Sequence, residues 1–248
     1  MKFNLPMTRN LFFFLPLFLL FQSAFCKTDE EEVKSSKIKE ELSELVTRKK
    51  VPGMIAAISS SKGILAMGSS GIRKVGNKEK LTEHDLVHLG SCTKPMTALL
   101  IGILVNEGKL SWKTSLTDAL PELKTSIHRH YHTVTLWELL THRAGVVANA
   151  EDWWTHGEME LKKRRLLIVQ ENLKKTSRTK RGSYHYSNMG YLIASCMAEK
   201  VTGSSWESLM HRRIFEPLGM SSAGFGPPGT TGKNDQPWGH SKPKNKWQ

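Results

Sequence analysis

The sequence predicts a protein of the α/β class, with a small amount of sheet and a large helical region. Two observations lead to this expectation. Residues 54–59 and 64–69 are short apolar runs joined by a polar turn, which is the pattern of a β-hairpin. Residues 110–220 instead carry apolar residues mainly at helical spacing. At 248 residues, the chain is long enough for one sizeable domain or two closely associated ones.

The longer helices are read from the spacing of their apolar residues. The first ends before Pro52, the second runs from Ser91 to a stop at Gly108, and a later one begins after Tyr186 and closes at Gly203. The apolar faces of these three helices are formed by Ile38, Leu42, Leu45 and Val46; by Met96, Leu99, Leu100, Ile103 and Leu104; and by Met189, Leu192, Ile193, Cys196, Met197 and Val201.

Two capping boxes, each a Ser or Thr followed three residues later by Glu, predict further helix starts at 135–138 and 204–207. His142 follows the first box and is interpreted as a hydrogen-bonded structural histidine rather than a general base. The histidines of residues 128–132 have no acidic partner at ligand spacing, and the chain lacks an HExxH motif. We therefore predict neither a metal nor another cofactor.

Composition indicates a folded, basic protein, with 39% hydrophobic residues, seven Trp and a net charge of +13. The densest basic run, residues 162–165, lies in a predicted helix that also carries glutamates. Because no aromatic residues or reader motif accompany this run, we interpret it as a solvated helix face and predict no nucleic-acid partner. Arg178, Lys180 and Arg181 precede the region of Tyr186 and are placed to favour a substrate carboxylate.

The N-terminus has the features of a secretory signal peptide, residues 1–26. Lys2 and Arg9 precede an apolar stretch, residues 11–21, and small residues follow this stretch before Cys26. This stretch is short for a transmembrane helix, which needs about 20 apolar residues. The expected location is therefore secreted, the lumen of the secretory pathway or the periplasm, without stable membrane insertion. Cys92 and Cys196 are interpreted as buried thiols.

A Ser and a Lys three positions apart stand at the head of the second helix. Residues i and i+3 of a helix share a face, so the Lys94 amine is placed to take the proton of the Ser91 hydroxyl. The same SxxK pattern also begins at Ser36, Ser59, Ser177 and Ser241, but only Ser91 has an apolar-faced helix behind it. The alternative is that Ser91 is an ordinary helix-capping serine.

Tyr186, Ser187 and Asn188 form the chain's single YxN motif, at the start of another apolar-faced helix. A phenol whose pKa is lowered by a neighbouring ammonium can act as a general base or proton relay, and an Asn side chain can hold a substrate amide. The alternative is a capping box beside a buried tyrosine.

These motifs in this order resemble the serine beta-lactamase-like family, which includes class C beta-lactamases, DD-peptidases and related esterases. The stretches LWELLTHRAGV, between the two motifs, and EPLGM, after them, add to the resemblance. It implies a mixed sheet flanked by helices, with an inserted all-helical domain. It also implies that Ser91 is the acylated nucleophile, Lys94 its activating partner and Tyr186 the base or relay, and that Asn188 contacts the substrate.

One family motif has no counterpart after YxN: Lys or His, then a small residue and Gly, on a strand beside the site. The nearest triplets, at 74–76 and 180–182, precede Tyr186. We therefore expect an incomplete sheet, in a family member cut short on its C-terminal side. The predicted parts are the signal peptide, a partial α/β domain with the nucleophile helix (27–107), a helical domain (108–225) and a loop leading to missing C-terminal strands (226–248).

The resemblance implies acyl transfer to water through an ester of Ser91, on a small-molecule or peptide-like amide, lactam or ester, with no cofactor. A chain without the third motif is expected to be catalytically poor. This leaves open a noncatalytic binding or scaffold role for the same fold. A hairpin with a bare edge is also expected to permit self-association.

Overall fold

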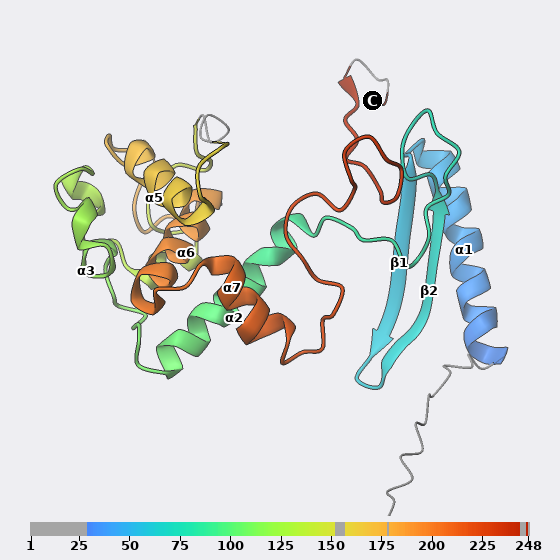
Figure 1. The fold of residues 1–248 in the computed structure, drawn as a ribbon, viewed down its shortest axis with the longest axis horizontal. Coiled ribbons are helices and arrows are strands. Elements are labelled where there is room, and N and C mark those ends of the chain that lie inside the picture. The colour runs from blue at the N-terminus through green and yellow to red at the C-terminus, as the bar shows by residue number, and fades with distance from the viewer. Residues whose placement is uncertain (1–28, 152–156, 178, 244–246, 248) are drawn as a thin grey trace, which may run out of the picture. The chain divides into compact units, whose positions relative to one another are not determined.

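The computed structural model describes residues 29–151, 157–177, 179–243 and 247, so the predicted signal peptide lies outside the described residues. The chain divides into two compact units. We call them the hairpin unit, Met1–His84 with His240–Gln248, and the helical unit, Asp85–Gly239. Figure 1 labels both strands and most of the α-helices, and each unit is described by itself.

The hairpin unit consists of one helix packed on a two-stranded antiparallel sheet. Helix α1 (Asp29–Lys49) leads into β1 (Gly53–Ser60), which pairs with β2 (Gly63–Gly71). Helix α1 lies along β2 (Figure 1), and a Cβ atom added at Gly68 would lie 2.8 Å from the Ile38 side chain. Glycine at this position therefore permits the close approach of helix and strand. The predicted first helix and hairpin are confirmed.

Polar contacts tie the segment after β2 to this helix and strand. The Glu83 carboxylate pairs with Lys39 at 3.0 Å and accepts a hydrogen bond from Ser69 Oγ at 3.1 Å. A hydrogen bond from its own backbone, followed by the Lys39 contact, lowers the pKa of Glu83 to about 2. At the other end of the sequence, His240 Nε2 accepts a hydrogen bond from the backbone N–H of Val75 at 3.0 Å, which attaches the C-terminal residues to this unit.

The helical unit is built from short and medium helices around one apolar core. Its largest helices pack together through fully buried residues, among them Leu100 and Ile101 of α2 and Ile193, Ala194 and Met197 of α6. The elements are η1 (Gly90–Cys92), α2 (Thr93–Asn106), α3 (Leu116–Ala119), η2 (Pro121–Leu123), η3 (Arg129–Tyr131), α4 (Leu136–Leu140), α5 (Leu161–Asn172), α6 (Asn188–Thr202), α7 (Trp206–Met210) and η4 (His211–Phe215).

The prediction of an almost wholly helical stretch from 110 to 220 was too strong. The described residues of 141–160 and 173–187 contain no helix. Their backbones bond to each other instead: Gly182 N–H donates to Arg143 O at 2.8 Å, and His185 N–H donates to the carbonyl of His142 at 2.8 Å. These hydrogen bonds hold the two irregular segments side by side and take the place of helical hydrogen bonds.

The boundary between the two units falls at residues 84 and 85, before the nucleophile helix, whereas the predicted domain boundary falls after it, at 107. Helix α2 groups with the helical unit because its buried residues belong to that unit's core.

Within the described residues the sheet has two strands. None of the described helices combines the length and the apolar character needed to span a membrane.

The predicted helix starts are mostly correct. Thr135 and Glu138 form the expected capping box of α4. The second box is wrong by one residue, because the cap of α7 is Ser205, whose Oγ accepts a hydrogen bond from Ser208 N–H at 3.2 Å. Its intended partner, Glu207, is instead bonded to an arginine.

Candidate active site

Ser91 lies in the η1 turn, and Lys94 lies in the first turn of α2 directly after it. The Lys94 Nζ atom donates a hydrogen bond to Ser91 Oγ at 3.1 Å. Helix α2 is capped by Cys92 without any side-chain hydrogen bond, so the alternative of Ser91 as a capping serine is wrong. Lys94 is helical even though Pro95 follows it. The spacing seen in the sequence therefore does bring the amine to the hydroxyl.

Tyr186 lies on the other side of the same hydroxyl. Its phenol oxygen is 2.8 Å from Ser91 Oγ, and Lys94 Nζ is 4.8 Å from the centre of its ring. The pKa of Tyr186 is lowered, first by its hydrogen bond to Lys94 and then by the one to Ser91, because both stabilise the phenolate. We call these three residues the Ser91 cluster.

The alternative reading of the YxN motif, a capping box with a buried tyrosine, is correct only in that Ser187 caps the helix; with Gly190 at the third helical position the box has no second side chain, and the tyrosine is not buried. Tyr186 is 42% exposed. Ser187 does cap α6, since its Oγ accepts a hydrogen bond from Gly190 N–H at 3.0 Å, but the same Oγ donates to Val147 O at 2.6 Å. The cap is thus tied to the neighbouring loop and fixes the direction in which Tyr186 leaves the helix.

His142 packs beneath Tyr186 and holds the YxN segment by two contacts. Its ring centre is 4.5 Å from that of Tyr186, with 31° between the planes, and its Nδ1 accepts a hydrogen bond from Ser187 N–H at 3.1 Å. The predicted hydrogen bonding of this histidine is confirmed. Burial, and then the charge of Lys94, lower the pKa of His142. In the neutral ring the proton therefore lies on Nε2.

Arg181 braces this region rather than lying free beside the site. Its guanidinium forms two hydrogen bonds of 2.7 Å to the Glu138 carboxylate and also bonds to Thr133. A Cβ atom added at Gly145, where φ is +68°, would lie 2.9 Å from Arg181 N, so the loops meet closely. The expectation that Arg181 favours a substrate carboxylate is corrected, because its charge is already paired. Arg178 lies outside the described residues.

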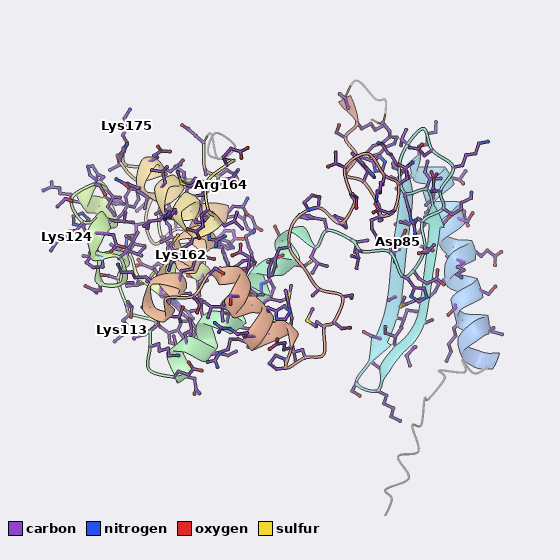
Figure 2. All side chains as sticks on the ribbon, in the orientation of Figure 1. Asp85, Lys113, Lys124, Lys162, Arg164 and Lys175 are labelled. Atoms are coloured by element: carbon purple, nitrogen blue, oxygen red, sulfur yellow. The ribbon has the colours of Figure 1, made fainter. Side chains whose placement is uncertain are left out.

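Asn188 lies next to the Ser91 cluster in sequence, but its side chain bonds elsewhere. Its Nδ2 donates to Asn149 Oδ1 at 2.7 Å, and both side chains line a cavity of about 430 Å³. Leu161 and Ile168 of α5 contribute to the apolar wall of the cavity. Arg164, labelled in Figure 2, lies on the same helix and also lines the cavity. Sequence reasoning missed Asn149, for which the only signal was its place shortly after the LLTHRAGV stretch.

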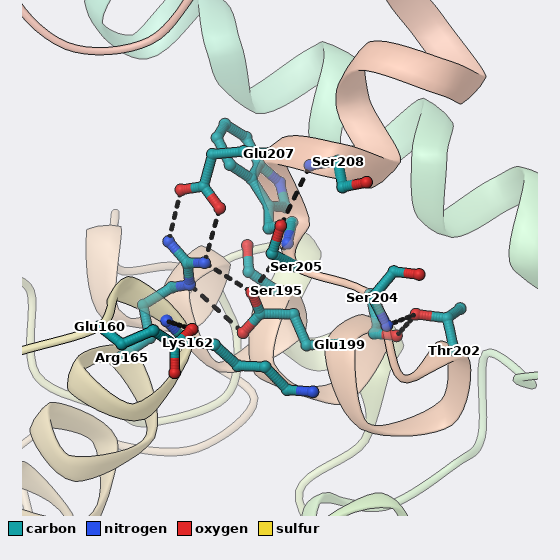
Figure 3. A network of polar contacts seen from close by, with 12 residues as sticks. Glu160, Lys162, Arg165, Ser195, Glu199, Thr202, Ser204, Ser205, Glu207 and Ser208 are labelled. Carbon is teal, nitrogen blue, oxygen red and sulfur yellow. Dashed lines mark hydrogen bonds and ion pairs between the residues drawn. The ribbon is translucent and has the colours of Figure 1, made fainter.

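The basic run 162–165 contains one residue that is not part of a solvated face. Arg165 is bonded between two carboxylates, with contacts of 2.5 Å to Glu199 Oε1 and 2.8 Å to Glu207 Oε1 (Figure 3). Burial opposes the charged form, but the two glutamates outweigh it and raise the pKa of Arg165. We call these three residues the Arg165 cluster. The interpretation of the whole run as solvated was wrong at this position.

The two cysteines differ in environment. Cys196, on α6, is buried as predicted, and burial raises the pKa of its thiol. Cys92 is exposed, so the prediction of a buried thiol was wrong there. Its place in the turn before α2 keeps it off the face formed by Thr97, Leu100, Ile101 and Leu104.

The fold and the site together define a mixed α/β protein of the beta-lactamase and penicillin-binding type. The family model described as Beta-lactamase matches residues 38–248, so the chain belongs to the beta-lactamase family. This confirms the resemblance seen in the sequence.

Individual relatives support the same membership. The chain is 25% identical over 177 residues to the unguisins hydrolase ungD' of Aspergillus campestris, covering 69% of this chain and 33% of that protein. It is 28% identical over 176 residues to penicillin-binding protein 4 of Amycolatopsis lactamdurans, covering 71% and 45%. An octameric penicillin-binding protein homologue from Pyrococcus abyssi superposes with a TM-score of 0.67 at 26% identity, covering 84% and 48%. The chain thus spans about a third to a half of these proteins.

Proposed function

We propose that this chain carries the nucleophile machinery of a serine hydrolase of the class C-like branch, acting through an acyl ester of Ser91. One observation carries the proposal: an amine and a phenol both lie within hydrogen-bond distance of the same serine hydroxyl. Lys94 Nζ lies 3.1 Å and the Tyr186 phenol 2.8 Å from Ser91 Oγ. A nucleophile within hydrogen-bond reach of a base, which is itself oriented by a third group, is the arrangement that activates serine.

In the acylation step, Ser91 Oγ attacks the substrate carbonyl carbon and transfers its proton to the Tyr186 phenolate. The neighbouring Lys94 ammonium makes this phenolate accessible by lowering the pKa of Tyr186. The carbonyl π bond opens to a tetrahedral oxyanion, which collapses as the leaving nitrogen or oxygen takes up the proton from Tyr186. Water then attacks the acyl ester by the same route and restores the Ser91 hydroxyl.

The substrate class we propose is an amide, lactam or ester. Asn188 is two residues after Tyr186 in the chain, and its amide is hydrogen-bonded to that of Asn149. Both side chains line the cavity of about 430 Å³, whose volume suits a small organic group. An Asn side chain offers both a donor and an acceptor, as an amide substrate requires. The names of the relatives, a hydrolase and a penicillin-binding protein, agree with chemistry at a carbonyl.

Covalent labelling tests the proposal without knowledge of the natural substrate. A fluorophosphonate probe, followed by intact mass and peptide mapping, should place one adduct on Ser91. The adduct should disappear in Ser91→Ala and persist in Ser59→Ala, a control at another SxxK serine, on β1. Label that survives in Ser91→Ala, or its absence from the folded parent protein, would show that Ser91 is not an activated nucleophile.

A further inference from the structure

A second cavity lies at the far ends of the two helices that carry the Ser91 cluster. Ser91 and Tyr186 precede the N-termini of α2 and α6, whereas this cavity is lined by Leu104 in the last turn of α2 and by Thr202, the last residue of α6. With 14 residues in α2, the two ends are about 20 Å apart. The cavity has a volume of about 380 Å³ and is separate from the proposed catalytic site.

Three cationic side chains and one carboxylate determine the charge of this cavity. Lys109, Arg212 and Arg213 line it. Lys109 pairs with Glu107 at 2.9 Å, and Arg213 pairs with the same carboxylate. Arg212 donates instead to a hydroxyl, Ser204 Oγ, at 2.9 Å, and no carboxylate among the residues that the structure describes pairs with it. The cavity therefore holds a surplus of two positive charges.

The surplus of positive charge is not needed to satisfy the backbone carbonyls at the C-termini of α2 and α6. The carbonyls there already have donors within the protein: Lys109 N–H donates to Leu104 O at 3.0 Å, and Thr202 Oγ1 donates to Ala198 O at 2.7 Å. Lys162 Nζ donates to Gly203 O at 3.2 Å. Arg212 therefore remains oriented by a hydroxyl at the wall of a cavity, with further N–H groups to donate.

We infer that this cavity binds a small organic phosphate. A phosphate monoester carries a charge of about −1.5 to −2 near neutral pH, which matches the surplus of two cations. The planar guanidinium of Arg212 suits the forked geometry of phosphate oxygens, and Lys109 supplies a mobile point charge. Leu104 and Leu209, both buried, offer apolar contact for the organic group.

Binding is measured by isothermal titration calorimetry on the full folded chain at constant ionic strength. The probes are phenyl phosphate, inorganic phosphate and phenol. Phenyl phosphate should bind more tightly than inorganic phosphate, and phenol should not bind measurably. Arg212→Gln and Lys109→Gln should each weaken phenyl phosphate binding by about tenfold or more, since each removes a charged hydrogen-bond donor. Arg212→Lys keeps the charge without the fork and should fall between Arg212→Gln and the parent.

Two controls locate the site. Lys113→Gln removes an exposed lysine of the same unit, labelled in Figure 2, and should leave the affinity unchanged because Lys113 does not line the cavity. Ser91→Ala should also leave it unchanged, because the cavity is remote from Ser91. No saturable binding of phenyl phosphate to the parent would overturn the inference. So would an equal loss of affinity in Lys113→Gln, or unchanged affinity in Arg212→Gln and Lys109→Gln that melt like the parent.

Discussion

The Ser91 cluster and the Arg165 cluster both depend on α6, yet they are opposite in exposure. Tyr186, just before the start of α6, is 42% exposed, whereas the side chain of Glu199, near its end, is 2% exposed. In the Ser91 cluster two groups contact one hydroxyl, and in the proposed mechanism protons pass between this cluster and a substrate. In the Arg165 cluster every partner is charged, and the three side chains are between 2% and 20% exposed. Exposure thus separates polar groups that can do chemistry from those that hold the fold together.

The energetics of the two clusters differ for the same reason. Removing a partner from an exposed hydrogen-bonded group costs little stability, because water replaces it. Removing a partner from a buried charge leaves the remaining charge uncompensated and is strongly destabilising. We therefore expect substitutions in the Ser91 cluster to change reactivity with little change in stability, and substitutions in the Arg165 cluster to do the reverse. The predictions below test this contrast.

The largest effect is expected on the reactivity of Ser91. Tyr186→Phe and Lys94→Met roughly keep the side-chain volume but remove the proposed base and the ammonium beside it. Each should lower the second-order rate of fluorophosphonate labelling by about 10² to 10⁴-fold, the usual contribution of general-base catalysis. The rate is measured by quenched labelling and mass spectrometry at fixed pH. Tyr184→Phe, at an exposed tyrosine outside the cluster, is the matched control and should label at the parent rate.

The same variants should unfold in urea at the parent midpoint. A Tyr186→Phe protein that labels at the parent rate would contradict the base role. If instead either variant were unfolded under conditions in which the parent is folded, the residue would be structural, and the contrast between the two clusters would fail.

The next effect is on stability. Glu199→Gln keeps the shape of the side chain but removes one of the two carboxylates that face Arg165, so the free energy of unfolding should fall by about 1.5–3 kcal/mol, the usual contribution of a hydrogen bond to a charged group. Glu207→Gln should cost less, because its side chain is 20% exposed and water can compensate in part. Urea unfolding followed by circular dichroism measures both. At temperatures where the variants remain folded, labelling of Ser91 should match the parent, and a large loss of labelling there would contradict the contrast.

The difference between the clusters also explains what the sequence could predict. Ser91 and Lys94 are three positions apart on one helix, so their contact follows from local geometry, and Tyr186 was found through a motif at a helix start. The Arg165 cluster depends on partners 34 and 42 residues away. On its own helix Arg165 is one of four consecutive basic residues, and nothing in that spacing shows which of them turns inward.

The fold follows the same rule. The hairpin and α6 were predicted because their apolar periodicity is local. The pairing of the loops around His142 and His185 was not predicted, since its backbone hydrogen bonds follow no periodic pattern. Asn149 was missed for a related reason: only the folded loop brings its side chain to Asn188.

A smaller effect should appear with pH at His142. Burial and Lys94 lower its pKa in the folded state, while the unfolded chain titrates near 6.5. Below that pH the unfolded state binds more protons than the folded state, so the stabilising contribution is complete above pH 6.5 and is lost as pH falls. His142→Gln should be less sensitive between pH 7.5 and 5.5 than the parent when urea midpoints are compared. Equal sensitivity would mean that His142 titrates as it does when unfolded.

The smallest effect is expected one residue along from Glu199. Lys200 pairs with Glu122 at 2.9 Å, but the two side chains are 47% and 37% exposed. An exposed ion pair gains little because water screens the charges and both side chains lose freedom, so Lys200→Gln should change the free energy of unfolding by no more than about 1 kcal/mol. Adding salt should reduce this difference further. Glu199 and Lys200 are adjacent on one helix and both form ion pairs, yet their substitution should lower the free energy of unfolding by amounts that differ severalfold. If Lys200→Gln were as destabilising as Glu199→Gln, exposure would not be the property that separates the two kinds of polar contact.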